Sequence, residues 1–191
     1  MSSTKTYLDF AATTPVDKRV VQAMLPYFDE TFGNPSSVHN YGQKAEDARD
    51  SARERIAKHL HCKPKELIFT SCGSESDNLA MRGAALAIRE KTGSNKILTT
   101  HIEHHAVSQT AIQLEKYFGF KVDWLETDEY GIIDPNTIRK AIRTDTALVS
   151  IMWGNNEIGS INPISEIGAI CREHGVQFHT DAVQAAAHLP T

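Results

Sequence analysis

Four short polar segments directly follow apolar runs, and each contains residues that could do chemistry. They are residues 71–76, 101–105, 153–159 and 179–184. In the first segment, Gly73 allows a tight turn and Ser74 places a hydroxyl beside the free N–H groups that begin a helix. Such a helix start binds phosphate well. The alternative is an ordinary helix cap without a ligand. No Gly-Lys-Ser/Thr follows, so the segment is not a Walker loop.

The second segment is rich in histidine and could bind a metal ion or a planar ring. His101, Glu103, His104 and His105 are of metal-ligand type, and His-x-Glu also begins the zinc deaminase signature. No Pro-Cys-x-x-Cys follows, and the His-Glu-x-x-His spacing is absent. An imidazole at the end of a strand could instead stack on a flat heteroaromatic ring.

The last two segments offer an amide and a carboxylate. Asn155 can donate and accept hydrogen bonds, which suits a phenolic oxygen or a substrate carboxylate, or it could simply tolerate a left-handed loop backbone. Asp181 lies beside apolar residues and needs a partner, such as a protonated heteroaromatic nitrogen. His179 and Asp181 could also bind a metal or form an ordinary hydrogen-bonded pair. A metal-dependent hydrolase that uses His101, Glu103, His104, His179 and Asp181 is therefore an alternative.

The elements that must position these residues alternate along the chain. Apolar runs predict strands at 67–70, 96–99, 122–125, 147–152 and 176–179. Helical periodicity predicts helices at 17–28, 42–60, 76–91, 106–117, 136–142 and 164–174. This alternation predicts an α/β fold, a mainly parallel sheet with helices on both faces. Ligands of such sheets bind beyond the carboxyl ends of the strands, where the four polar segments fall.

The composition is that of an ordinary globular protein. The 191 residues are 40% hydrophobic and 23% charged, and the net charge of -4 gives no reason to expect nucleic acid or an anionic membrane as partner. Cys62, Cys72 and Cys171 form no CxxC pair, and no apolar segment follows Met1. No run approaches the ~18 apolar residues of a membrane span. We therefore expect a cytoplasmic protein with reduced thiols.

Taken together, the motifs resemble those of the cysteine desulfurases, a class V group of pyridoxal-phosphate enzymes with the fold type I architecture. The resemblance runs from Tyr7 to the last residue. It depends on residues 7–15, 32–37, 69–71, 75–80, 103–104, 155–159 and 179–184. Several motifs in the right order are far more specific than any one of them.

The resemblance implies a role for each candidate toward pyridoxal 5'-phosphate. Gly73 and Ser74 would hold the phosphate, and His104 would stack on the ring and could move protons. Asp181 would pair with the pyridinium nitrogen, which keeps the ring able to take up electrons. Gln184 would touch the phenolic oxygen of the ring.

It also implies a substrate and partners. Asn155 would lie near the phenolic oxygen and the substrate carboxylate, and Ala12 would line the substrate site. The reaction would remove sulfur from L-cysteine, leaving alanine and a persulfide for iron–sulfur or thio-cofactor assembly. An iron–sulfur scaffold or another sulfur-acceptor protein would then be a partner, and the chain would form a homodimer or pair with a C-terminal half.

The sequence departs from the family pattern in two places. The phosphate turn reads Ser71-Cys72-Gly73-Ser74-Glu75, where the family commonly has Thr in place of Ser74. The family's Schiff-base lysine follows Ser-x-His shortly beyond the position of Gln184, whereas this sequence ends at Thr191. We therefore expect the lysine, the nucleophilic cysteine, a substrate-binding arginine and the small C-terminal domain to be absent, and the 191-residue chain to be inactive alone.

The resemblance divides the chain into two parts. Residues 1–40 would form a segment that lines the substrate site, and residues 41–191 would form the front part of the cofactor-binding domain. Two alternatives remain open: a noncatalytic cofactor-binding or scaffold protein, and one half of a split enzyme.

Overall fold

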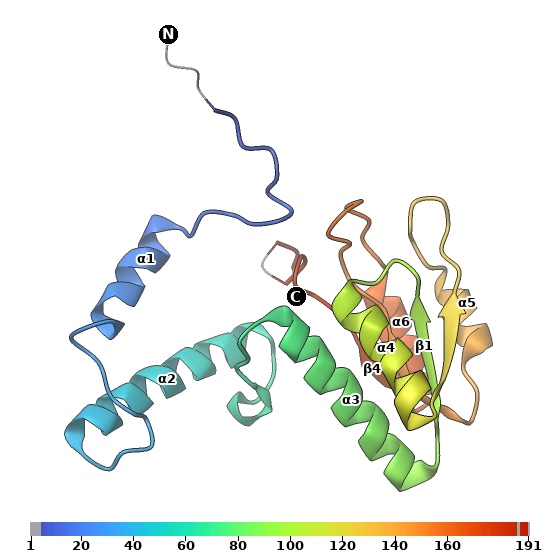
Figure 1. Ribbon diagram of the computed structural model, residues 1–191, viewed down its shortest axis with the longest axis horizontal. Coiled ribbons are helices and arrows are strands. Elements are labelled where there is room, and N and C mark those ends of the chain that lie inside the picture. The colour runs from blue at the N-terminus through green and yellow to red at the C-terminus, as the bar shows by residue number, and fades with distance from the viewer. Residues whose placement is uncertain (1–4, 187, 191) are drawn as a thin grey trace. The chain divides into compact units, whose positions relative to one another are not determined.

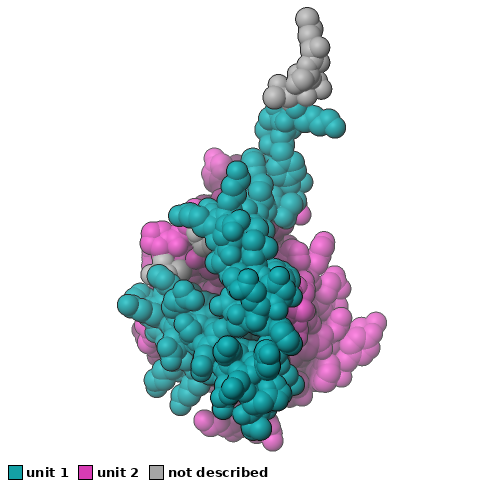
Figure 2. Space-filling view, turned by 90° about the vertical axis from the view of Figure 1, so that its left-hand side faces the viewer, with its two compact units in different colours: residues 1–69, 191 teal, residues 70–190 magenta. Residues whose placement is uncertain are grey.

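The computed structural model describes residues 5–186 and 188–190. The described chain forms two compact units, one within residues 1–69 and the other within residues 70–190 (Figure 2). The sheet and all of the polar segments that follow its strands belong to the second unit.

The regular elements of the first unit are helices, joined by turns and irregular segments. They are α1 (Lys18–Met24), the 3-10 helix η1 (Leu25–Tyr27), α2 (Asn40–His59) and the 3-10 helix η2 (Pro64–Glu66). The Asp17 carboxylate caps α1 by accepting a hydrogen bond from the Arg19 N–H, at 2.8 Å. The helix predicted over 17–28 changes to 3-10 geometry at Leu25, because Pro26 has no N–H and restricts the residue before it.

The strand predicted at 67–70 is wrong. This segment is extended, with φ -88° and ψ 133° at Leu67, but it pairs with no strand within the described residues. Ile68 is 69% exposed, and the Phe69 ring lies under the Arg53 guanidinium, 4.6 Å from the ring centre. An apolar β-branched run favours extended backbone, but a ladder also needs a neighbouring strand, which the local pattern does not specify.

The second unit contains the predicted parallel sheet. The strands are β1 (Lys96–Thr100), β2 (Lys121–Leu125), β3 (Thr146–Ser150) and β4 (Gln177–His179), in the order β2-β1-β3-β4, and every pair is parallel. The helices are α3 (Gly73–Thr92), α4 (His105–Phe118), α5 (Pro135–Ala141) and α6 (Ile164–Glu173) (Figure 1). The prediction of a mainly parallel α/β sheet is confirmed.

Helices cover both faces of the sheet. Side chains of successive strand residues point to opposite faces. Ile97 and Leu148 accordingly pack in one core with residues of α3 and α4, while Leu98 and Val149 pack in a second core with residues of α5 and α6. All five residues of β3 are buried, as expected for a central strand covered on both sides.

Strand pairing continues beyond the end of β4. The Ile151 N–H donates to the His179 carbonyl at 3.1 Å, and the Trp153 N–H donates to the Asp181 carbonyl at 2.9 Å. The polar residues that follow β3 and β4 are therefore held on a rigid sheet edge. In Figure 1, α3 and α4 begin on the side of the sheet toward which the arrow of β1 points. No helix within residues 5–186 and 188–190 is long and apolar enough to cross a membrane.

Candidate functional site

The start of α3 presents free backbone donors. The N-cap residue Cys72 makes no side-chain capping bond to any described residue, so the N–H groups of the first turn, at Gly73 and Ser74, remain available. The Glu75 carboxylate instead accepts bonds from the N–H and hydroxyl of Ser71, at 2.7 and 2.6 Å, which lower the pKa of Glu75. An uncapped helix start of this kind can bind an anion.

Gly73 packs tightly against the segment that follows β4. A Cβ atom on Gly73 would lie 2.8 Å from Cγ2 of Val183, closer than real Cβ contacts allow. The absence of a side chain therefore permits the helix start and the 181–184 segment to approach each other. Two of the predicted polar segments, residues 71–76 and 179–184, meet here, although Gly73 and Val183 are 110 positions apart in the sequence.

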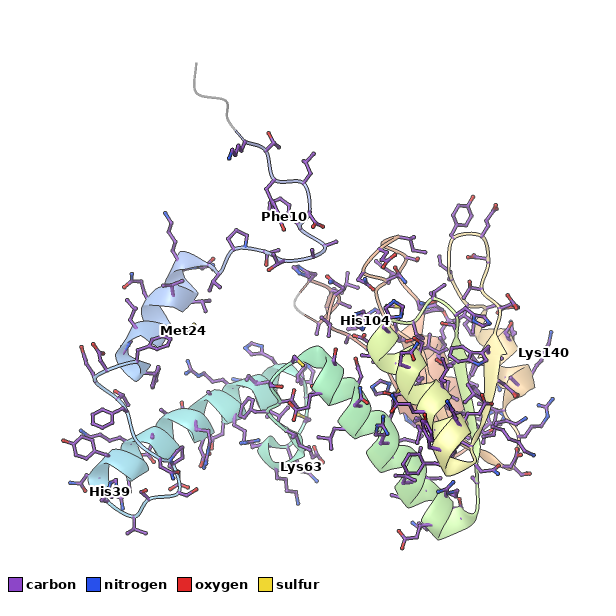
Figure 3. The ribbon with its side chains drawn as sticks, viewed as in Figure 1. Phe10, Met24, His39, Lys63, His104 and Lys140 are labelled. Carbon is purple, nitrogen blue, oxygen red and sulfur yellow. The ribbon has the colours of Figure 1, made fainter. Side chains whose placement is uncertain are left out.

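His104 is the N-cap of α4, and this fixes its ring (Figure 3). Its Nδ1 accepts a hydrogen bond from the Ala106 N–H at 3.1 Å, so the neutral ring carries its proton on Nε2. Nε2 has no hydrogen-bond partner among the residues described. His101 is engaged elsewhere, because its ring stacks on Trp124 with 5.0 Å between ring centres and 15° between planes. Of these two histidines, His104 has the ring atom free to meet a ligand.

The Asn155 side chain holds the loop that follows β3. Its Nδ2 donates to the Ile102 carbonyl at 2.9 Å, and its Oδ1 accepts bonds from the N–H groups of Glu157 and Ile158, at 2.8 and 3.0 Å. Asn155 thus ties this loop to the segment that follows β1. The two segments, residues 101–105 and 155–158, line a cavity of about 330 Å³.

Glu103 is a buried carboxyl group that joins the ends of β1 and β3. It is 7% exposed, and its Oε1 accepts bonds from the Thr100 hydroxyl at 3.1 Å and the Met152 N–H at 2.8 Å. Its Oε2 is buried without a hydrogen-bond partner among the described residues. Burial raises the pKa of Glu103 to about 8, so the group is mostly neutral at pH 7.

Asp181 is also buried, at 7% exposure, but it keeps an available oxygen. Its Oδ1 accepts a bond from the Val183 N–H at 2.9 Å, the one hydrogen bond to this carboxylate within the described chain. Burial raises the pKa of Asp181; the Val183 bond opposes this, the charge of Asp77 adds to it, and His104 and His179 lower it. The other oxygen, Oδ2, is therefore available to accept a hydrogen bond from a cationic donor.

His179 does not pair with Asp181, as one sequence alternative allowed. Its Nε2 lies 3.5 Å from Oδ1 of Asp77 on α3, and its Nδ1 lies 2.8 Å from the Ser150 hydroxyl. The sequence reasoning missed Asp77. A signal was present, because Asp77 falls on the helix face that carries the buried Met81, four residues later.

Gln184 and Ala12 are the remaining predicted site residues. Gln184 lies in the turn that follows Asp181 and is half-buried. Ala12 belongs to the first unit, where its N–H donates to the Asp9 carbonyl at 3.2 Å in an exposed turn. Within residues 5–186 and 188–190, no group of three His, Cys, Asp or Glu residues is placed to hold a metal ion.

This region of the second unit thus combines a helix start without a side-chain cap, a fixed imidazole and a buried carboxylate. The aminotransferase class V family matches residues 6–191, nearly the whole chain. The chain belongs to this family. The resemblance predicted from the sequence motifs is confirmed, and so is the fold that it implied.

Relatives of this class V chain are cysteine desulfurases. It is 52% identical over 184 residues to cysteine desulfurase IscS of Methanosarcina thermophila and 49% identical over 184 residues to that of Dictyoglomus turgidum, in each case over 96% of this chain. These alignments cover 45% and 46% of the two relatives. The chain therefore spans about half the length of the curated relatives it matches.

Solved structures also match nearly the whole of this chain over about half of their own length. The structure of SspA in complex with cysteine matches with a TM-score of 0.87 and 40% identity, over 95% of this chain and 51% of SspA. The crystal structure of DndA from Streptomyces lividans matches with a TM-score of 0.85 and 41% identity, over 97% of this chain and 51% of DndA. The class V chain thus has the fold of about half of each of these proteins.

Proposed function

We propose that this chain is the cofactor-holding part of a cysteine desulfurase, which uses pyridoxal 5'-phosphate to remove sulfur from L-cysteine and leaves alanine and a persulfide. The observation that carries the proposal is the meeting of three groups at one sheet edge. They are the uncapped start of α3, the fixed ring of His104 and the buried Asp181. The names of the relatives and the cysteine complex of SspA support the same substrate class.

The residues present fit this cofactor. The free N–H groups of Gly73 and Ser74 would donate to its phosphate, where the positive end of the helix dipole adds attraction. Gly73 is needed there, since a Cβ would collide with Val183. When bound, pyridoxal phosphate supplies an aromatic ring that accepts electrons from the bonds of an amino acid. The protein supplies orientation and electrostatics.

Two side chains would act on the ring nitrogen and on the ring face. Asp181 would accept a hydrogen bond from the ring nitrogen and hold a proton there, an interaction worth about 1.5–3 kcal/mol when one partner is charged. His104 would lie against the ring face, and its Nε2 is the atom able to give or take a proton, because Nδ1 is occupied by Ala106. Gln184 would contact the phenolic oxygen, and Asn155 would lie close to that oxygen and the substrate carboxylate.

The complete reaction belongs to a longer protein or complex in this proposal. Residues 1–40, including Ala12, would line the substrate site, and residues 41–191 would form the front of the cofactor domain. No Ser-x-His-Lys segment occurs in residues 1–191, so the 191-residue segment alone would release no sulfide. The persulfide would pass to an iron–sulfur scaffold or another acceptor protein in the cytoplasm, and the protein would act as a homodimer.

A titration tests the cofactor assignment directly. The purified chain is titrated with pyridoxal 5'-phosphate, and binding is followed by the absorbance and induced circular dichroism of the bound cofactor. We expect saturable binding that inorganic phosphate weakens by competition at the start of α3. A chain that is folded but binds no cofactor would contradict the proposal. A full-length protein that binds cofactor yet never releases sulfide from L-cysteine would favour the noncatalytic alternative.

A further inference from the structure

Asp77 is a buried carboxylate to which the proposed function gives no role so far. It is 5% exposed, and it lies on α3 on the same face as the buried residues Met81 and Ala85. Within the described chain, Nε2 of His179 lies 3.5 Å from Oδ1 of Asp77, a contact that is an ion pair only when the imidazole is protonated. The Ser150 hydroxyl, 2.8 Å from Nδ1, fixes the other side of the same imidazole. Asp77 is therefore held in one place inside the protein.

The sheet brings Asp77 and Asp181 to the same side. The N–H groups of Ile151 and Trp153 donate to the carbonyls of His179 and Asp181, so strand pairing extends through residue 181. Residues two apart on an extended strand project to the same face. His179 and Asp181 accordingly share a face, and His179 contacts Asp77 there.

The charge of Asp77 reaches Asp181. Burial is the main cause that raises the pKa of Asp181, and the negative charge of Asp77 raises it further. A charge that makes a proton bind more tightly to Asp181 also stabilises any other cation held by that carboxylate. The other titratable groups around Asp181 act differently. His104 and His179 lower its pKa, and Glu103 is mostly neutral at pH 7 because of its own burial.

We propose that Asp77 is a positioning residue of the cofactor site: held by His179, its carboxylate acts across Asp181 to favour a positively charged ring nitrogen. This inference deepens the proposed function and depends on it. Asp181 would hold the ring nitrogen, His104 would lie against the ring face, and Asp77 would act from behind Asp181. Asp77 itself would not touch the cofactor.

The test compares two ligands that differ in charge at one atom. Pyridoxal 5'-phosphate and its 1-deaza analogue, in which C–H replaces the ring nitrogen, are titrated into the wild-type protein and into Asp77→Asn. The control is Glu90→Gln, which removes one carboxylate from an exposed position on the same helix. Dissociation constants are measured by equilibrium dialysis, and thermal unfolding followed by circular dichroism checks that each variant is folded.

We expect Asp77→Asn to bind pyridoxal phosphate roughly tenfold more weakly, about 1.4 kcal/mol, and to bind the deaza analogue as the wild type does. Glu90→Gln should change neither constant. Asp77→Glu, which keeps the charge, should retain the preference for the natural ring. It also serves as the test if Asp77→Asn does not fold, since loss of the preference in this charged variant would overturn the inference.

Two other outcomes would refute the role of Asp77 without touching the proposed function. An equal loss for both ligands would show that Asp77 only supports the structure. No loss for either ligand would show that its charge does not reach the site. If the wild-type protein binds neither ligand, the proposed function itself fails, and the inference fails with it.

Discussion

Replacing Glu103 by glutamine should make the stability of the second unit less sensitive to pH. The pKa of Glu103 rises from 4.5 to about 8 in the folded protein, mainly through burial. Below pH 4.5 the group is protonated in both states. Between pH 4.5 and 8 the unfolded chain loses the proton while the folded protein keeps it, so the free energy of unfolding falls as the pH rises. Above pH 8 the group is ionised in both states, and the full free-energy cost of burying the charged carboxylate is present.

The magnitude follows from the size of the shift. A shift from 4.5 to about 8 corresponds to at most about 5 kcal/mol, at about 1.4 kcal/mol for each unit. Glutamine has no such cost, and its carbonyl can accept the bonds from Thr100 and Met152. Its amide, however, would occupy the place of the unpartnered Oε2, at a cost of about 1–3 kcal/mol. The variant should therefore be the less stable protein at pH 5 and the more stable one at pH 9.

Urea denaturation at a series of pH values between 5 and 9 measures this difference. Both tryptophans, Trp124 and Trp153, lie in the second unit, so intrinsic fluorescence reports its unfolding. Taking the difference between variant and wild type cancels most of the contribution of the histidines. Glu90→Gln, at an exposed position, should show a difference that does not depend on pH. A difference for Glu103→Gln that is also constant from pH 5 to 9 would refute the reasoning.

Three further results are expected. Asp181→Ala should weaken retention of pyridoxal phosphate by roughly 10- to 100-fold, since a charge-assisted bond of about 1.5–3 kcal/mol is lost, and unchanged retention in equilibrium dialysis would remove Asp181 from the pyridinium role. Gly73→Ala should weaken cofactor binding in the same assay, because the new Cβ would lie 2.8 Å from Cγ2 of Val183. Adding Val183→Ala should restore binding, and a double variant that still binds weakly would show that this collision is not the cause. The 191-residue segment should release no sulfide from L-cysteine with pyridoxal phosphate present, and catalytic release detected by methylene blue formation would contradict this expectation.

The sheet could be predicted from the sequence because the residue pattern of its strands matches the burial that their places in the sheet require. The buried β3 reads as an almost continuous apolar run, and the polar segments follow the strands where a parallel sheet places its ligand edge. Residues 67–70 satisfy the same local pattern, yet they form no ladder with any described residue. The difference lies in the partner strand, which an isolated run of four residues cannot specify.

The candidate site could be predicted only in part. The positions of His104 and Asp181 after their strands follow from the alternation of elements, and the helix start at Gly73 follows from the turn residues that precede it. The partner of His179 could not be read locally, because Asp77 is 102 positions away in numbering and reaches it only through the packing of α3 on the sheet. Side-chain pairing between distant elements is decided by tertiary packing, which no spacing rule encodes.

Burial acts on two neighbouring carboxyl groups in the same direction but leaves them with different chemistry. Glu103 and Asp181 are both 7% exposed, and burial raises the pKa of each. Glu103 uses one oxygen for two bonds that join the strand ends, so its neutral form serves as a structural link. Asp181 has the imidazoles of His104 and His179 nearby, which favour its ionised form, and an oxygen that no described residue engages. A raised pKa therefore does not distinguish the ligand-binding carboxylate from the structural one, and neither does an unengaged oxygen, because Oε2 of Glu103 also has no partner among the described residues. The two imidazoles that lower the pKa of Asp181 do distinguish it.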